Sequence, residues 1–128
     1  ANYDPSLLRA YLDGEFVNLT TGQVYDRFDR AKHVTATMPD ITREPVRVGI
    51  DFNVGNMSAV IAVRLNNGLL VIDEIAGAHD TDALAQEIRR RHPQQQIYIY
   101  PDASGGSRST NASQTDIQIL ESYGMSNQ

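Results

Sequence analysis

The sequence contains no cysteine, which excludes a disulfide framework and any zinc site built on thiolates. It also contains no Gly-x-x-x-x-Gly-Lys-Ser/Thr motif, so a P-loop ATPase is excluded. No apolar run approaches the ~20 residues that cross a bilayer, and the first residues lack the basic-then-apolar order of a signal peptide. We therefore expect no membrane contact and a cytoplasmic location.

Positive charge is also scarce, with 11 Lys and Arg against 16 Asp and Glu and a net charge of −5 at pH 7. A domain that only binds nucleic acid usually carries a basic face, so the excess of acidic over basic residues argues against simple DNA binding. It leaves open an enzyme that acts on DNA, because clustered carboxylates can hold metal ions. The 128 residues suffice for one core and not comfortably for two.

The first third of the chain differs in character from the rest. Residues 5–12 are expected to form a short helix, and residues 15–19 and 23–28 a hairpin around Thr-Thr-Gly. Residues 29–45 are polar and carry Pro39 and Pro45, which is typical of a connecting segment. We predict that residues 1–45 are a linker.

Residues 46–128 follow an α/β pattern. Three runs joined by tight turns predict antiparallel strands over residues 46–52, 58–65 and 69–75. A helix over residues 82–91, capped at His79–Thr81, crosses to a fourth strand over residues 96–100, and a second helix covers residues 113–123. The crossover makes the fourth strand parallel to an earlier one, most economically the first. This order opens an RNase H-like mixed sheet, which we expect to be C-terminally incomplete, with a further strand beginning where the chain stops.

Asp51 and Asp102 each follow one of the two strands that we expect to be parallel neighbours. Their carboxylates then lie at one sheet edge, on backbones roughly 4.8 Å apart. Two anions about 5 Å apart repel by ~3 kcal/mol at an effective dielectric near 20, so such a pair shares a proton or binds a cation. Carboxylate oxygens suit Mg²⁺ or Mn²⁺. The alternative is that both aspartates simply open turns.

Other side chains are weaker candidates. Glu74, on the third strand, is a possible additional metal ligand if it faces the same side of the sheet. Asn53 and Asn56 fit a turn better than a role in orienting a ligand. Arg108, just past the second aspartate, could contact phosphate. We expect Arg89–Arg91 to form a solvated helix end that complements the helix dipole.

The acidic strand ends lie in recognisable stretches. The first reads Val-Gly-Ile-Asp-Phe-Asn over residues 48–53, and the hairpin after it ends Val-Ile-Asp-Glu-Ile over residues 71–75. The second reads Tyr-Pro-Asp-Ala-Ser-Gly over residues 100–105. In this order they resemble the nuclease domain of the large terminase subunit of tailed bacteriophages. Residues 11–17 and 22–25 resemble the segment that joins the packaging ATPase to that nuclease.

The resemblance implies a metal-dependent endonuclease that cuts concatemeric double-stranded DNA with Mg²⁺ or Mn²⁺ held by three acidic residues. Asp51 and Asp102 match the first two, and the third is expected beyond residue 128. It implies as partners the packaging ATPase domain, the portal and the small terminase subunit, inside an infected bacterial cell. Without a third carboxylate, the chain is expected to cut DNA weakly or not at all.

Two other functions stay open. An actin-like nucleotide-binding fragment also begins with an aspartate-ended strand, a turn and a hairpin, although Asn53–Asn56 fits its phosphate-binding turn only loosely. A non-catalytic module that docks partners or positions DNA would need no metal. An acidic residue on a later helix would favour the nuclease.

Overall fold

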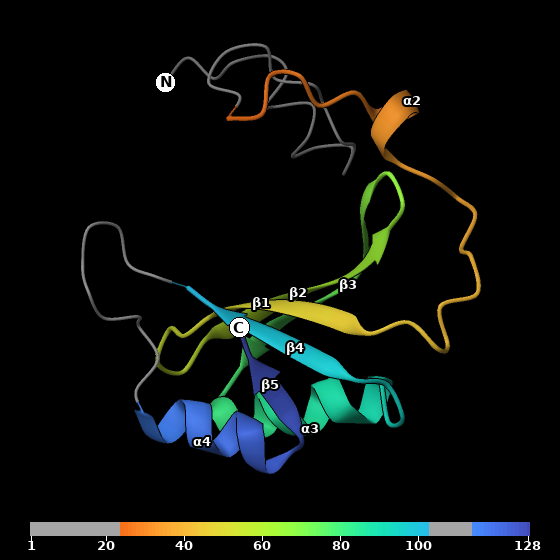
Figure 1. The fold of residues 1–128 in the computed structure, drawn as a ribbon. Coiled ribbons are helices and arrows are strands. Elements are labelled where there is room, and N and C mark those ends of the chain that lie inside the picture. Colours follow the sequence, from red (N-terminus) through yellow and green to blue (C-terminus); the bar gives the residue numbers. More distant parts are fainter. Residues whose placement is uncertain (1–23, 103–113) are drawn as a thin grey trace, which may run out of the picture. The chain divides into compact units, whose positions relative to one another are not determined.

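The computed structural model describes residues 24–102 and 114–128 (Figure 1). The chain divides into two compact units, Ala1–Pro39 and Asp40–Gln128. The helix expected over residues 5–12 lies outside the described residues, as does most of the hairpin over residues 15–28. The linker role of residues 1–45 stays a prediction.

The described part of the first unit holds one short helix, α2 (Arg30–His33), within the segment that we expected to be irregular. Asp29 caps it by accepting a hydrogen bond from the Ala31 amide at 3.0 Å. The Phe28 and His33 rings stack with centroids 5.5 Å apart. None of these residues is buried, so the turn is held by local contacts alone.

The second unit is built on a mixed sheet of five strands in the order β3-β2-β1-β4-β5. The strands are β1 (Val46–Asp51), β2 (Met57–Leu65), β3 (Gly68–Ala78), β4 (Ile97–Pro101) and β5 (Met125–Asn127). β1, β2 and β3 pair antiparallel, whereas β4 lies parallel to β1 and β5 parallel to β4. The predicted α/β class, with three antiparallel strands and a parallel fourth, is confirmed.

Two strands differ from the prediction by more than a single residue at one end. β3 continues to Ala78 instead of ending at Ile75, and two register shifts against β2 accompany its greater length. β5 lies within the chain, so the expectation that the next strand begins only at the chain end was wrong. Its three residues are too few to show a period-two pattern. Gly124, at φ 78°, makes the turn that sends Met125 back beside β4.

Both long helices of this unit, α3 (Thr81–Arg91) and α4 (Gln114–Ser122), lie against the same face of the sheet (Figure 1). The Asp80 side chain caps α3 by accepting from the Ala83 amide at 2.8 Å, as the sequence predicted. The core lies between these helices and the sheet. The largest fully buried side chains are Val46, Val48, Ile61, Val63, Leu84, Ile88, Ile97, Ile99 and Leu120.

No described element of the second unit covers the opposite face, which we call the open face. It is formed by Arg47, Gly49, Asp51, Ser58, Val60, Ala62, Arg64, Leu69, Val71 and Tyr100. On β1, Arg47, Gly49 and Asp51 lie on the open face because side chains alternate along a strand. The residues between and before them, Val46, Val48 and Ile50, point into the core. Within residues 24–102 and 114–128, no helix is long and apolar enough to cross a membrane.

Candidate functional site

Asp51 and Asp102 lie side by side at one edge of the sheet. Ile50 of β1 is in register with Pro101 of β4. The Asp102 amide donates to the Ile50 carbonyl at 3.1 Å, which continues the parallel pairing by one step. The two aspartates are thus the next residues of neighbouring parallel strands. Their role as metal ligands stays a prediction.

Both aspartates line a hollow of about 530 Å³ at the end of the open face. Ser58 of β2, the register partner of Asp51, lines it too, as does Tyr100. Asp102 is exposed and Asp51 is partly buried. Water, a cation and a large substrate can therefore reach the pair.

Asn53 fixes the position of the first carboxylate. Its Nδ2 donates to Asp51 Oδ2 at 2.8 Å. Asn53 also begins a tight turn, closed by the Asn56 amide donating to its carbonyl at 3.0 Å, with Gly55 at φ 75°. The turn considered for Asn53 is therefore present, and its side chain also holds Asp51, whose role as a metal ligand stays a prediction. A neighbour that orients a carboxylate is what a metal ligand commonly has.

Glu74 lies on the same side of the sheet but apart from the pair. It is in register with Val60 of β2, so β2 separates it from β1. Two strand spacings across and two residues along give roughly 12 Å between its Cα and that of Asp51. Among the described residues, no three His, Cys, Asp or Glu side chains form a group that could hold a metal ion. The structure does not bring Glu74 together with Asp51 and Asp102.

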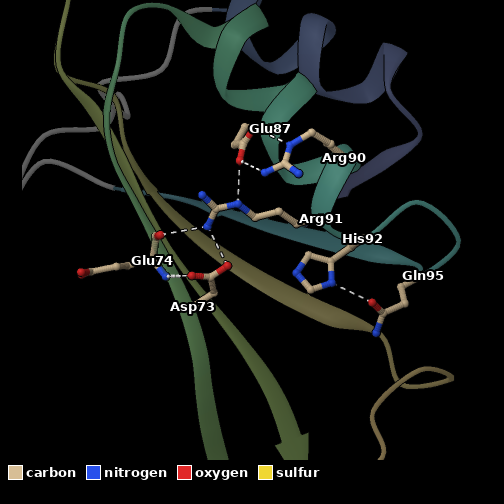
Figure 2. A network of polar contacts seen from close by, with 7 residues as sticks. All are labelled: Asp73, Glu74, Glu87, Arg90, Arg91, His92 and Gln95. Atoms are coloured by element: carbon tan, nitrogen blue, oxygen red, sulfur yellow. Dashed lines mark hydrogen bonds and ion pairs between the residues drawn. The ribbon is translucent and has the colours of Figure 1, made fainter.

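Asp73, the neighbour of Glu74, faces α3 and belongs to a polar network on the helix side (Figure 2). Arg91 Nη1 donates to Asp73 Oδ2 at 2.6 Å and to the Glu74 carbonyl at 3.1 Å. Arg91 Nε donates to Glu87 at 2.8 Å, and Arg90 binds the same carboxylate. Figure 2 shows the Glu74 side chain pointing away from this network.

The network shifts the titration of its acids. Hydrogen bonds from Arg90 and then Arg91 lower the pKa of Glu87 to about 2. Burial raises the pKa of Asp73, but the hydrogen bonds from Arg91 and from the Glu74 amide outweigh it, so that this pKa is lowered overall. Both carboxylates therefore stay ionised well below neutral pH.

Arg89 donates four hydrogen bonds to three backbone carbonyls at the end of α3. Its Nε and Nη2 donate to the Tyr123 carbonyl at 3.1 and 2.7 Å, and Nη1 donates to the carbonyls of His92 and Gln95. The expectation of a solvated helix end holds for the exposed Arg90 and was wrong for Arg89 and Arg91, which are partly buried. The charge of Arg89 is used to hold the end of α4 and the loop before β4, contacts between segments far apart in the sequence.

Two arginines of the open face were not singled out from the sequence. Arg47 on β1 donates to the Tyr100 hydroxyl, and its guanidinium lies 5.0 Å above the Tyr98 ring. Arg64 lies on β2 near the same end. The signal that points to Arg47 is the alternation Val-Arg-Val-Gly-Ile-Asp, which puts it on the same face as Asp51. Arg108, the phosphate-binding candidate, lies outside the described residues.

No protein-family model matches the chain, and a search of curated proteins found no significant match. The fold and the geometry of the open face are therefore the basis for the function proposed next.

Proposed function

We propose that this chain is part of a metal-dependent endonuclease with an RNase H-like fold, similar to the nuclease domain of phage large terminase subunits. Its substrate is double-stranded DNA, and Asp51 and Asp102 hold Mg²⁺ or Mn²⁺. The observation that carries the proposal is the adjacency of these two carboxylates at the ends of parallel strands, on an accessible face.

The donor set fits a hard divalent cation. The neighbouring strands lie about 4.8 Å apart, and both side chains open into the same hollow. Carboxylate oxygens are the preferred ligands of Mg²⁺ and Mn²⁺. Asn53 holds one oxygen of Asp51, which reduces the rearrangement needed on binding. A bound cation would also relieve the repulsion between the two anions.

The roles of the residues follow from this arrangement. When bound, divalent ions activate water and stabilise the charge that develops on a phosphodiester. Asp51 and Asp102 bind the ion and fix its place at the sheet edge. Asn53 orients Asp51, and the exposed position of Asp102 leaves room for a phosphate. A further acidic ligand, if one completes the site, would come from outside the described residues.

The sheet supports the finer fold assignment. Three antiparallel strands, a crossover helix and parallel β4 are the pattern expected of an RNase H-like sheet. β5 extends it with a second crossover through α4. The packaging ATPase domain, the portal and the small terminase subunit in an infected bacterial cell are the partners that go with this proposal. An actin-like site has less support, because the side-chain amide of Asn53 donates to Asp51 and is not free for a phosphate.

Manganese binding tests the proposal. Titration of the full chain with Mn²⁺, followed by electron paramagnetic resonance, should give an affinity that falls at least ~10-fold in Asp51→Asn and in Asp102→Asn. Glu74→Gln, which removes the same charge about 12 Å away, should leave the affinity unchanged. Equal affinities in all four proteins would exclude the site.

Cleavage is tested separately by nicking of supercoiled plasmid with Mn²⁺. We expect little or no cutting by the 128-residue chain and cutting by a protein that is extended beyond residue 128. Asp51→Asn should abolish cutting in the extended protein with its fold intact. Near-normal cutting by that variant would exclude Asp51 as an essential ligand, and inactivity of both proteins would favour a non-catalytic role in positioning DNA.

A further inference from the structure

Arg47 and Arg64 lie at the end of the open face away from the two aspartates. Arg47 is in register with Ala62, and Arg64 is two residues further along β2, so the two are diagonal neighbours with Cα atoms ~7–8 Å apart. Both line a hollow of about 400 Å³ together with Glu44 and Asn66. Both also line a larger groove of about 660 Å³ that runs along the sheet.

Neither arginine has a carboxylate partner among the described residues. Arg47 binds only a phenol and an aromatic ring, and its Nε–H is buried there without an acceptor. Arg64 makes no ion pair or hydrogen bond within the part of the chain that the structure describes. Arg90 and Arg91 on α3, by contrast, are both paired with Glu87. In a chain with net charge −5, two adjacent cations without carboxylate partners indicate an external anion.

Most of the open face is apolar or aromatic, and Glu74 of β3 lies on it in register with Val60. Val60, Leu69 and Val71 are 49%, 67% and 62% exposed, and Tyr100 is 38% exposed. Gly49 lies in the middle, and a Cβ built on it would meet nothing within 4 Å. The face therefore offers an apolar groove with two arginines at one end and two aspartates at the other, and with Glu74 on its β3 side.

We infer that the open face is a binding track for a single, unpaired nucleic-acid strand. Arg47 and Arg64 bind one backbone phosphate, and the bases that follow lie on Tyr100 and the aliphatic residues. Further along the same nucleic-acid strand, the phosphate to be cleaved then lies beside Asp51 and Asp102. This last step rests on the proposed function, whereas the binding itself does not. Taken with the proposed function, it requires the double-stranded substrate to be locally unpaired where it crosses the sheet.

The dimensions fit such a strand. Arg47 and Asp51 are four residues apart on β1, about 13 Å along the strand. That distance equals about four steps of a stacked strand at 3.4 Å per step, and fewer of an extended one.

The chemistry favours one strand over two. An intact duplex offers mainly phosphates to a flat surface, which would leave the apolar groove in water. Unpaired bases present their rings, and stacking on aromatic side chains is the usual way in which proteins hold single strands.

Binding of a fluorescein-labelled oligothymidylate, followed by anisotropy in EDTA so that no cleavage occurs, tests this inference. The full chain should bind the single strand more tightly than a duplex of equal length. Arg64→Gln should weaken binding roughly tenfold, as expected for one charge-assisted contact, and should make the salt dependence shallower by about one phosphate. Arg90→Gln, with the same charge change on the helix layer, is the matched control and should bind as the unchanged chain does.

Two further variants separate charge from shape. Gly49→Leu fills the groove without altering charge, and the open space and ordinary φ at this position accommodate it; it should weaken binding of the single strand. Glu44→Gln removes the carboxylate beside the arginines and should tighten binding.

Several results would overturn the inference: equal losses in Arg64→Gln and Arg90→Gln, no effect of Gly49→Leu, or tighter binding of the duplex. No binding of any oligonucleotide, together with self-association that Val71→Glu abolishes, would assign the face to a second copy of the chain. The proposed function fails separately. A chain whose single-strand binding depends on Arg64 but that never binds Mn²⁺ or cuts would contradict only the nuclease proposal.

Discussion

The two faces of the sheet differ in how completely their side chains find partners. On the helix side, Leu84 and Ile88 are fully buried and Arg89 is held by backbone carbonyls. On the open side, Leu69 is two-thirds exposed and Arg64 has no partner among the described residues. The helix side therefore supplies most of the stability, and the open side keeps groups available for ligands.

Both faces come from the same strands, so their separation depends on register. Along β1, Val46, Val48 and Ile50 alternate with Arg47, Gly49 and Asp51. A slip by one residue would exchange the two sets. The buried aliphatic residues thus also fix the side on which Asp51 appears, and folding and site geometry are coupled through this alternation.

The largest expected contrast comes from one substitution made on each face. Leu84→Ala removes a fully buried side chain and should lower the free energy of unfolding by ~2–5 kcal/mol. Leu69→Ala, on the open face, should change it by no more than ~0.5 kcal/mol. Urea unfolding followed by circular dichroism measures both. A cost at Leu69 close to that at Leu84 would mean that the open face is covered in solution.

A second contrast tests the arginines. Arg89→Gln breaks contacts with the Tyr123, His92 and Gln95 carbonyls, and should lower the free energy of unfolding by ~1.5–3 kcal/mol. Arg64→Gln loses no partner among residues 24–102 and 114–128, and should change the free energy of unfolding by less than ~0.5 kcal/mol. The same urea titration serves, and comparable losses in the two variants would show that Arg64 has a structural partner.

The third prediction concerns the carboxylates of the open face. In EDTA, Asp51→Asn should raise the free energy of unfolding by about 1 kcal/mol, because it removes a repulsion of ~3 kcal/mol that exposure of Asp102 weakens. Mn²⁺ should raise the melting temperature of the unchanged chain and leave that of the variant unaltered. A variant that is less stable than the unchanged chain in EDTA would show that the pair does not repel.

Much of the fold can be predicted from local sequence patterns. The β-branched runs, the turn at Asn66–Gly68 and the Asp80 cap act over a few residues, and each element predicted between residues 46 and 128 has its counterpart. Strand β5 was not predicted because three residues are too few to show a periodic pattern of apolar side chains. The extension of β3 to Ala78 was not predicted because its pairing with β2 contains two register shifts, which no local sequence pattern indicates.

The site was predictable only where strand pairing dictates it. Parallel pairing of β1 and β4 was enough to expect Asp51 beside Asp102. The separation of Glu74 required knowing that β2 intervenes and how its register runs. The partners of Arg89, including the Tyr123 carbonyl 34 residues away, depend on how α4 docks, and nothing local encodes that contact.

The smallest expected effect tests the charged network of the helix side. The pKa of Glu87 in the folded chain, about 2, lies below its ordinary value of 4.5 because Arg90 and Arg91 bind the ionised carboxylate. Ionised Glu87 therefore stabilises the fold at pH above 4.5, and this contribution is lost as pH falls from about 4.5 to about 2. Glu87→Gln should melt slightly below the unchanged chain at pH 7, and the two melting temperatures should converge near pH 2. The effect is small because Glu87 is partly exposed to water and salt, which screen its ion pairs. Glu121→Gln on α4, where the exposed carboxylate has no ion pair among the described residues, is the control and should follow the unchanged chain at every pH. If the melting temperatures of both variants converged with that of the unchanged chain at low pH, acid would act through the overall charge of the protein. If the difference in melting temperature between Glu87→Gln and the unchanged chain were the same at every pH, the arginines would hold the Glu87 side chain by packing instead of charge.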